Sequence, residues 1–271
     1  MGEQETIEKR KNGPNTVASL EAELYSAGLR PGMTVLLHSS LSSLGWVCGG
    51  PVAVILAFQR VLTEEGTLVM PTHSGDLSDP AQWEHPPVPQ EWWETIRNTM
   101  PSYRKDRTPS SRMGTIPETF RKMDGVLRYS HPQVSFAAWG KNKEYILQDE
   151  HYDYAMNDQS PLGRIYDLDG QVFLLGVGHN NNTSIHLAEY RAQWPSKLYI
   201  KNGMPIEING ETLWREFDEL AYGGDDFKAL GADFEAQYHI NPCQVGNAAC
   251  RLFSQRALVD YAVRWIEKNR K

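Results

Sequence analysis

A histidine and a glutamate stand three residues apart in the segment Thr183–Glu189, which follows a short apolar run and a turn of small residues. If the segment is helical, His186 and Glu189 lie on one face of the helix. A carboxylate beside an imidazole fixes its tautomer and raises its basicity, as a general base requires. The pair therefore predicts a group that takes a proton from a reacting atom. Spacing alone also allows a half-buried structural histidine next to a surface carboxylate, and slightly favours it.

A second stretch combines small hydroxyl residues with glycines. The run His38–Ser43 follows an apolar segment and precedes Gly49 and Gly50. Such turns point backbone N–H groups and hydroxyls outward, where they can hold phosphate oxygens. The candidate ligand-binding residues here are His38, Ser39, Ser40 and Leu41. The run contains no lysine and does not match a nucleotide-binding P-loop, and an ordinary serine-rich connection is the alternative.

A third stretch, Thr108–Gly114, is another Ser/Thr loop that opens a predicted helix. Its Arg112 could meet an anion. An ordinary capped helix start is the alternative. The pair His131-Pro132 indicates a constrained turn, which is more often structural than catalytic.

The elements that position these residues alternate between buried strands and helices. We predict strands at Met33–Leu37, Thr67–Met70, Val134–Trp139 and Val172–Leu175, and helices at Thr16–Ala27, Gly50–Leu62, Ile116–Lys122, Thr183–Ala192 and Ser254–Lys268. The alternation indicates an α/β fold with a largely parallel central sheet. Because ligands in such sheets bind past the carboxyl ends of strands, the three stretches are well placed to form a site.

Two segments depart from this alternation. Thr72–Ser111 is long and rich in Trp and Pro, and we interpret it as an ordered lid or wall with a short helix at Glu91–Asn98. Pro205–Trp214 contains Asn209-Gly210 and predicts a hairpin with a type I′ turn. An antiparallel hairpin late in a parallel fold predicts a mixed sheet with helices on both sides. We expect residues 1–15 to be a flexible leader and residues 16–271 to form a single domain.

Composition narrows the classes of function. The chain has 271 residues and a formal net charge of −7, which disfavours nucleic acid and suits a cationic small molecule. It contains no apolar run of membrane-spanning length and no secretory signal, and its three cysteines form no recognisable framework. We therefore expect a cytoplasmic protein that is a monomer or a homodimer. Neither a GxSxG elbow, an HExxH pair, a dinucleotide fingerprint nor the acetyl-CoA signature of the GNAT acetyltransferases occurs.

Taken in order, the motifs resemble the aminoglycoside 3-N-acetyltransferase family. The matching segments extend over roughly residues 16–268 and are Leu37–Gly45, Gly49-Gly50, Gly66–Pro71, Ser130-His131-Pro132, Ser160-Pro161-Leu162 and Leu174–Gly178 through His186–Glu189. The resemblance implies an α/β/α sandwich around a mixed sheet, unrelated to the GNAT fold. It also implies acetyl-CoA as the acyl donor, no metal, and the 3-amino group of a deoxystreptamine ring as the acceptor.

The resemblance further implies roles for individual residues. His186 would be the general base and Glu189 its orienting partner. The acyl group would pass directly from the thioester to the amine, without an acyl-enzyme. The coenzyme would lie against His38 through Leu41, and the loop of Thr108, Ser110, Ser111, Met113 and Gly114 would complete its site. Among several acidic candidates for holding the polycationic acceptor, we select Asp76 and Glu219.

Three other functions fit the same sequence. The enzyme could acetylate a different small-molecule amine, because the segments Thr72–Arg107 and Lys197–Ile240 match no motif of the family. A metal-dependent hydrolase could use the scattered histidines and carboxylates, and stoichiometric zinc would reveal it. A non-catalytic binder with a decayed site would release no coenzyme A thiol with any acceptor.

Overall fold

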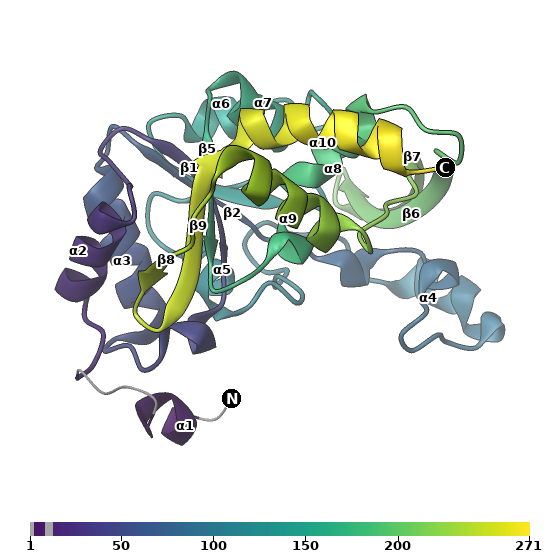
Figure 1. The fold of residues 1–271 in the computed structure, drawn as a ribbon. Helices are drawn as coiled ribbons and strands as arrows, with labels where there is room; N and C mark the ends of the chain where they lie inside the picture. Colours follow the sequence, from purple (N-terminus) through teal and green to yellow (C-terminus); the bar gives the residue numbers. More distant parts are fainter. Residues whose placement is uncertain (1–2, 9–12) are drawn as a thin grey trace.

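The computed structural model describes residues 3–8 and 13–271 and is built around one mixed sheet (Figure 1). Within the described residues this sheet has seven strands in the order β3-β4-β2-β1-β5-β9-β8. Their bounds are β1 Thr34–Ser39, β2 Thr67–Pro71, β3 Leu127–Arg128, β4 Phe136–Gly140, β5 Gln171–Leu175, β8 Cys243–Val245 and β9 Ala248–Ser254. The three central strands β2, β1 and β5 are parallel, whereas β4 and β9 pair antiparallel on either side.

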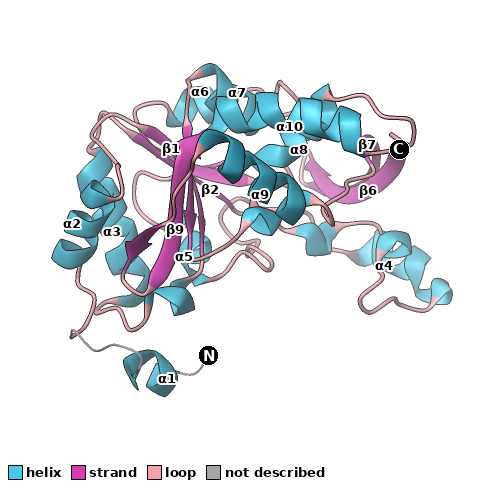
Figure 2. Cartoon of the chain, in the orientation of Figure 1, coloured by secondary structure: helices cyan, strands magenta, loops and turns pink. Residues whose placement is uncertain are grey.

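Helices cover both faces of the sheet and confirm the predicted three-layer α/β/α sandwich (Figure 2). One face carries α2 (Val17–Ser26), α3 (Gly50–Leu62) and α5 (Thr115–Phe120). The other carries α6 (Lys143–Leu147), α7 (Pro161–Asp167), α8 (Ser184–Arg191), α9 (Phe227–Tyr238) and α10 (Gln255–Asn269). None of the helices in the described part of the chain is long and apolar enough to cross a membrane.

The parallel strands read as continuous apolar runs because both of their faces are covered. In β1, Val35 and Leu37 enter the core beneath α2 and α3, while Leu36 enters the core beneath α7 to α10. In β5, Phe173 and Leu174 divide between the two cores in the same way. Successive side chains of a strand point to opposite faces, so one short apolar run supplies both layers.

The helix caps follow the sequence signals. Thr16 caps α2, where its side chain accepts from the Ser19 N–H at 3.1 Å and the Ser19 hydroxyl accepts from the Thr16 N–H at 2.9 Å. Ser254 caps α10 by accepting from the Ala257 N–H at 3.2 Å. These capping bonds, reciprocal at Thr16 and single at Ser254, satisfy backbone groups that the first helical turn leaves unpaired.

The expected leader falls partly outside the described residues. A helix, α1, extends over Glu3–Glu8, and residues 1–2 and 9–12 are not described. Asn15 is fully buried, and its side-chain amide donates to the Leu44 carbonyl at 2.8 Å. The chain is therefore attached to the sandwich from Asn15 onward.

The late hairpin forms, but it does not join the central sheet. Strands β6 (Tyr199–Ile208) and β7 (Glu211–Leu220) make a separate two-stranded sheet around Met204, Ile206 and Phe217. Asn209 and Gly210 both have positive φ, 53° and 85°, which confirms the type I′ turn. The central sheet is mixed because β4 and β9 pair antiparallel with β2 and β5. The prediction that the hairpin makes this sheet mixed is therefore wrong. An alternating pattern of apolar and polar residues predicts that a strand forms, but it does not specify which sheet the strand joins.

The Trp- and Pro-rich segment is a series of short turns closed by an ion pair. It contains the 3₁₀ turns Gly75–Leu77, Pro80–Gln82 and Gln90–Trp92 and the helix α4 (Trp93–Thr99), close to the predicted Glu91–Asn98. The Arg97 guanidinium donates to both carboxylate oxygens of Asp79, with Nη2–Oδ1 at 2.7 Å. Figure 1 shows α4 lying well away from the central sheet, with the hairpin as its neighbour.

His131 acts as a structural connector in the turn that leads into β4. Its Nδ1 accepts the N–H groups of Gln133 and Val134, both at 3.1 Å, and its Nε2 donates to the Tyr152 carbonyl at 3.2 Å. Burial lowers the pKa of His131 to about 4. The ring is thus a neutral cross-link, which accounts for the His131-Pro132 motif without a catalytic role.

Gly231 lets helix α9 approach the loop that follows β5. A Cβ at this position would lie 2.1 Å from Cγ of His179, which sits in the 3₁₀ turn His179–Asn181. Glycine inside a helix ordinarily costs about 1 kcal/mol relative to alanine. Here it removes a steric clash and allows His179 to pack beneath the helix.

Replacing His131 by asparagine should flatten the dependence of stability on pH. The pKa of His131 lies below its ordinary value when the chain is folded, so the unfolded chain takes up this proton first as the pH falls. The contribution of His131 to the free energy of unfolding is complete above about pH 6.5. Between about pH 6.5 and 4 this contribution falls by about 1.4 kcal/mol per pH unit. Urea denaturation of wild type and His131→Asn over this range measures the difference, and identical slopes would contradict it.

Gly231→Ala should destabilise the protein despite the better helix propensity of alanine. Overpacking of this kind costs about 1–3 kcal/mol. Gly224→Ala is the matched control, because a Cβ there meets nothing within 4 Å. Thermal and urea denaturation should separate the two variants, and equal stability would show that His179 moves aside freely.

Candidate active site

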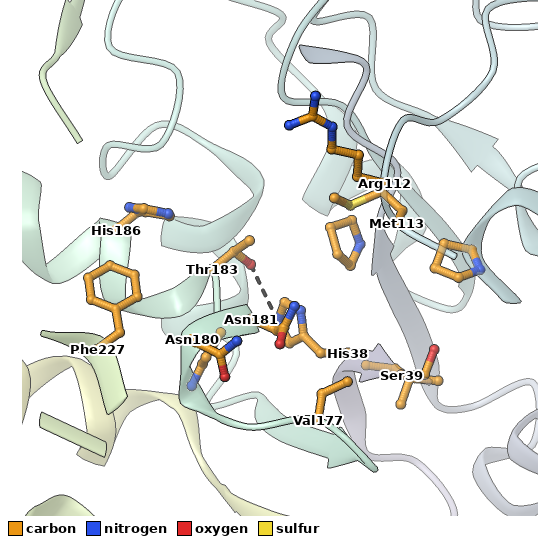
Figure 3. Close-up of a pocket in the computed structure, with 14 residues that line it drawn as sticks. His38, Ser39, Arg112, Met113, Val177, Asn180, Asn181, Thr183, His186 and Phe227 are labelled. Atoms are coloured by element: carbon orange, nitrogen blue, oxygen red, sulfur yellow. Dashed lines mark hydrogen bonds between the residues drawn. The ribbon is translucent and has the colours of Figure 1, made fainter. Parts of the chain in front are cut away.

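Three cavities meet at the carboxyl ends of the parallel strands. The central cavity, about 190 Å³, is lined by Leu37, His38, Ser39, Pro71, Arg112, Met113, Pro117, Val177, Asn180, Asn181, Asn182, Thr183, His186 and Phe227. Its walls come from the ends of β1 and β2, from the loop after β5 and from α8 (Figure 3). This is the edge of a parallel sheet at which ligands are expected to bind.

The predicted pair His186 and Glu189 is formed in helix α8. His186 Nδ1 lies 2.6 Å from Glu189 Oε2, so the imidazole N–H donates to the carboxylate. Glu189 is fully buried, whereas the side chain of His186 is 19% exposed and lines the central cavity. With Nδ1 bearing the proton, the lone pair of Nε2 is available to accept one.

Two aromatic rings hold the imidazole from the sides. The ring of His186 lies 4.8 Å from that of Tyr222 and 5.0 Å from that of Phe227. Burial raises the pKa of Tyr222 well above its ordinary value, so its hydroxyl stays protonated and joins that of Tyr190 at 3.1 Å. The rings restrict the imidazole to one orientation.

Glu219, one of the two predicted acceptor residues, lies behind this aromatic wall. It is buried in β7 and accepts from the Asn202 side-chain amide at 2.9 Å. Burial raises the pKa of its carboxyl group. Glu219 lines none of the three cavities, so the structure does not bring it together with the predicted partner Asp76.

His38 stands on the opposite wall of the central cavity. Its Nε2 lies 3.4 Å from the Thr183 hydroxyl, and the residue is buried at the end of β1. Burial, together with the neighbouring His179 and His186, lowers the pKa of His38 to about 3. The ring is therefore neutral at physiological pH and offers a polar contact without a charge.

The strand β1 extends further than predicted. His38 and Ser39, expected in a polar loop, pair with Leu174 and Leu175 of β5, and a 3₁₀ turn follows at Leu41–Leu44. The Ser39 hydroxyl is buried and has no hydrogen-bond partner among the residues that the structure describes. The candidate hydroxyl residues are thus presented by a strand end and a tight turn.

A second cavity, here called the hydroxyl cavity, opens beside this turn. It measures about 630 Å³ and is lined by Ser39, Ser40, Leu41, Ser42, Gly45, Trp46, Val47, Gly50, Arg112, Met113, Gly114, Thr115, Ile116, Val177 and Asn181. Ser39, Ser40 and Leu41 of one predicted coenzyme segment therefore line the same cavity as Met113 and Gly114 of the other. The predicted coenzyme residue His38 lines the central cavity instead. Thr108, Ser110 and Ser111 do not line the hydroxyl cavity. The hydroxyls of Thr108 and Ser110 bond to the Arg104 N–H and the Glu118 carboxylate, and Ser111 lines the third cavity described below.

A third cavity, here called the tryptophan cavity, is walled by the Trp- and Pro-rich segment. It measures about 730 Å³ and is lined by His73, Gly75, Asp76, Ser78, Gln82, Trp83, Glu84, His85, Pro86, Val88, Ser111, Arg112 and Met113. It contains the predicted acceptor residue Asp76 and a second carboxylate, Glu84. An aromatic ring beside two carboxylates suits a cationic ligand.

Arg112 and Met113 line all three cavities. Arg112 has φ of 60°, an unusual conformation for a residue other than glycine. Its side chain forms no ion pair with any residue in the described part of the chain. Figure 3 shows Arg112 and Met113 across the pocket from His186.

Several residues of the site escaped the sequence analysis. Tyr222, Phe227 and the asparagines of the 180–182 turn come from segments without a recognised motif. The run of three asparagines before the helix was visible but was not assigned a role. Within residues 3–8 and 13–271, no group of three or more His, Cys, Asp or Glu side chains is arranged to hold a metal ion.

Comparison with known proteins gives one family. The family described as aminoglycoside 3-N-acetyltransferase matches residues 36–267. A prophage-derived aminoglycoside N(3')-acetyltransferase-like protein of Bacillus subtilis, YokD, is 47% identical over 94% of both chains, and its crystal structure superposes with a TM-score of 0.95 over 98% of both.

Two further relatives agree. Aminoglycoside N(3)-acetyltransferase VII of Streptomyces paromomycinus is 32% identical over 96% of this chain and 94% of its own. The structure of AAC-IIIb with CoASH has 28% identity and a TM-score of 0.83, covering 94% of this chain and 97% of its own. The chain therefore belongs to the aminoglycoside 3-N-acetyltransferase family.

Proposed function

We propose that this protein transfers an acetyl group from acetyl-CoA to the 3-amino group of an aminoglycoside, with His186 as general base and Glu189 as its orienting partner. The observation that carries the proposal is the position of His186. Its imidazole lines a small central cavity that shares Arg112 and Met113 with a larger cavity on each side. A base at the junction of two substrate cavities suits transfer between the substrates.

Each outer cavity suits one substrate. The hydroxyl cavity is lined by serine hydroxyls, by glycines and by the unpaired Arg112, which are groups that bind phosphate and pantetheine. The bound CoASH of AAC-IIIb supports coenzyme A as the ligand of this fold. The tryptophan cavity, with Asp76 and Glu84, suits an acceptor that carries several ammonium groups.

The reaction requires a neutral amine, because an ammonium has no lone pair. The acceptor ammonium first gives up one proton to solvent, and the neutral amine then attacks the thioester carbonyl as a second proton passes from its nitrogen to His186 Nε2. A nitrogen–carbon bond forms, the tetrahedral intermediate collapses, and the carbon–sulfur bond breaks to release the coenzyme A thiolate. The imidazolium formed is stabilised by Glu189 at 2.6 Å, and its proton can return to the thiolate. No covalent acyl-enzyme is needed.

The function is tested by release of coenzyme A thiol from acetyl-CoA across a panel of amines. Aminoglycosides with a free 3-amino group should turn over, and analogues in which that amine is absent or blocked should not. Turnover of unrelated small amines alone would instead assign the same chemistry to another acceptor. Absence of thiol release with every amine would overturn the proposal.

His186→Ala should reduce kcat by about 10²- to 10⁴-fold, the usual contribution of a positioned general base. The KM for acetyl-CoA should change little, because the imidazole contacts the reacting amine. His239→Asn is the control, since His239 follows α9 and lines none of the three cavities. Turnover of His186→Ala near the wild-type rate would exclude His186 as the base.

Arg112→Gln should raise the KM for acetyl-CoA several-fold and make it less sensitive to salt. Loss of one charge contact to a phosphate weakens binding and its ionic-strength dependence. Arg107→Gln removes an exposed arginine of the same loop, which pairs with Asp106 instead, and should leave the KM unchanged. Equal KM values for the two variants would place the coenzyme phosphates elsewhere.

A further inference from the structure

Glu189 has a second partner that the sequence motif does not contain. The Arg270 guanidinium, directly after α10, donates from Nη1 to Glu189 Oε1 at 2.6 Å. The Gly223 N–H donates to the same oxygen at 3.2 Å. One carboxylate oxygen is thus bound by a cation and a backbone amide, which leaves the other oxygen, Oε2, to His186.

Arg270 is itself held in place from two further elements. Its Nε and Nη2 donate to the two carboxylate oxygens of Asp226, at 2.7 and 2.8 Å, and its guanidinium lies 5.1 Å from the Trp194 ring centroid. The Arg270 side chain is only 12% exposed. A bidentate pair at this burial fixes the plane of the guanidinium and therefore the direction of its third bond.

We propose that Arg270 is a positioning residue for the acetyl transfer, which orients Glu189 and sets how strongly the His186–Glu189 pair binds its proton. This inference rests on the proposed role of His186. Arg270 lies beyond the segment matched to the family, which ends at residue 267, and it does not line the central cavity. It acts only through Glu189.

The direction of the effect follows from charge. A cation beside Glu189 lowers the affinity of the His186–Glu189 pair for a proton, so its removal raises that affinity and retains the proton to higher pH. The other titratable groups that act on this pair or on Arg270 stay in place when Arg270 is replaced. They are Lys197 after α8, Glu219 in β7, Tyr222 and Asp226 before α9, His38 in β1 and His73 after β2. Tyr190 in α8 acts on Tyr222 through the bond between their hydroxyls.

The test compares Arg270→Gln, Arg270→Lys and wild type by two readouts. The first is the acid limb of the pH profile of kcat/KM, and the second is the pH titration of the His186 imidazole followed by NMR, assigned by its loss in His186→Gln. In Arg270→Gln both midpoints should move to higher pH by roughly one unit, the shift typical of a lost neighbouring charge. Arg270→Lys, which keeps the charge, should stay close to wild type.

Arg256→Gln is the matched control, because Arg256 belongs to α10 and pairs with Asp169 at 3.6 Å, near the opposite end of that helix. It should leave both midpoints unchanged. A merely structural Arg270 would lower stability or activity at every pH without moving either midpoint, and that result would overturn the inference.

A replacement variant and a readout that needs no turnover allow the role of Arg270 to be tested separately from the proposed function. If Arg270→Gln fails to fold, Asp226→Asn replaces it: loss of this carboxylate should move the His186 midpoint to lower pH, and an unchanged midpoint overturns the inference. The NMR titration needs no turnover. If wild type acetylates no amine yet the midpoint still moves in Arg270→Gln, the proposed function fails while the charge coupling stands.

Discussion

A buried carboxylate that must be satisfied constrains the site more than any other group. Glu189 is fully buried, and a lone charge there would cost several kcal/mol. The structure meets this cost with three donors, His186, Arg270 and the Gly223 amide. Because the donors come from α8, from the residue after α10 and from the loop before α9, the carboxylate couples the packing of these elements to the orientation of one imidazole.

A second cluster of a histidine, a glutamate and an arginine lies elsewhere in the structure, but its histidine does not line the central cavity. His179 Nε2 lies 3.0 Å from the Glu235 carboxylate, which also pairs with Arg251, so a histidine, a glutamate and an arginine again form a chain. Burial lowers the pKa of His179, and its ring stacks on Phe253 at 5.4 Å. Both nitrogens are occupied, since Asn182 approaches Nδ1 at 3.4 Å. The two clusters share their residue types, but of the two histidines only His186 lines the central cavity.

Much of the scaffold and part of the site could be predicted from the sequence. Apolar runs gave the three parallel strands, and spacing gave the His186–Glu189 pair, because both depend on neighbours in the chain. The strands β8 and β9 and the separate sheet of the hairpin were missed, since pairing partners leave no local pattern. Arg270 was missed for the same reason: 81 positions separate it from Glu189, and only the folded chain brings them together.

The shared wall of the three cavities has a consequence for how ligands in different cavities influence each other. Arg112 and Met113 belong to one short loop that faces the hydroxyl cavity, the tryptophan cavity and the central cavity alike. A ligand that shifts this loop from one side changes the shape met by a ligand on the other. Thermodynamic linkage makes any such influence equal in both directions. Substitutions in this loop should thus change binding in the hydroxyl cavity and in the tryptophan cavity together.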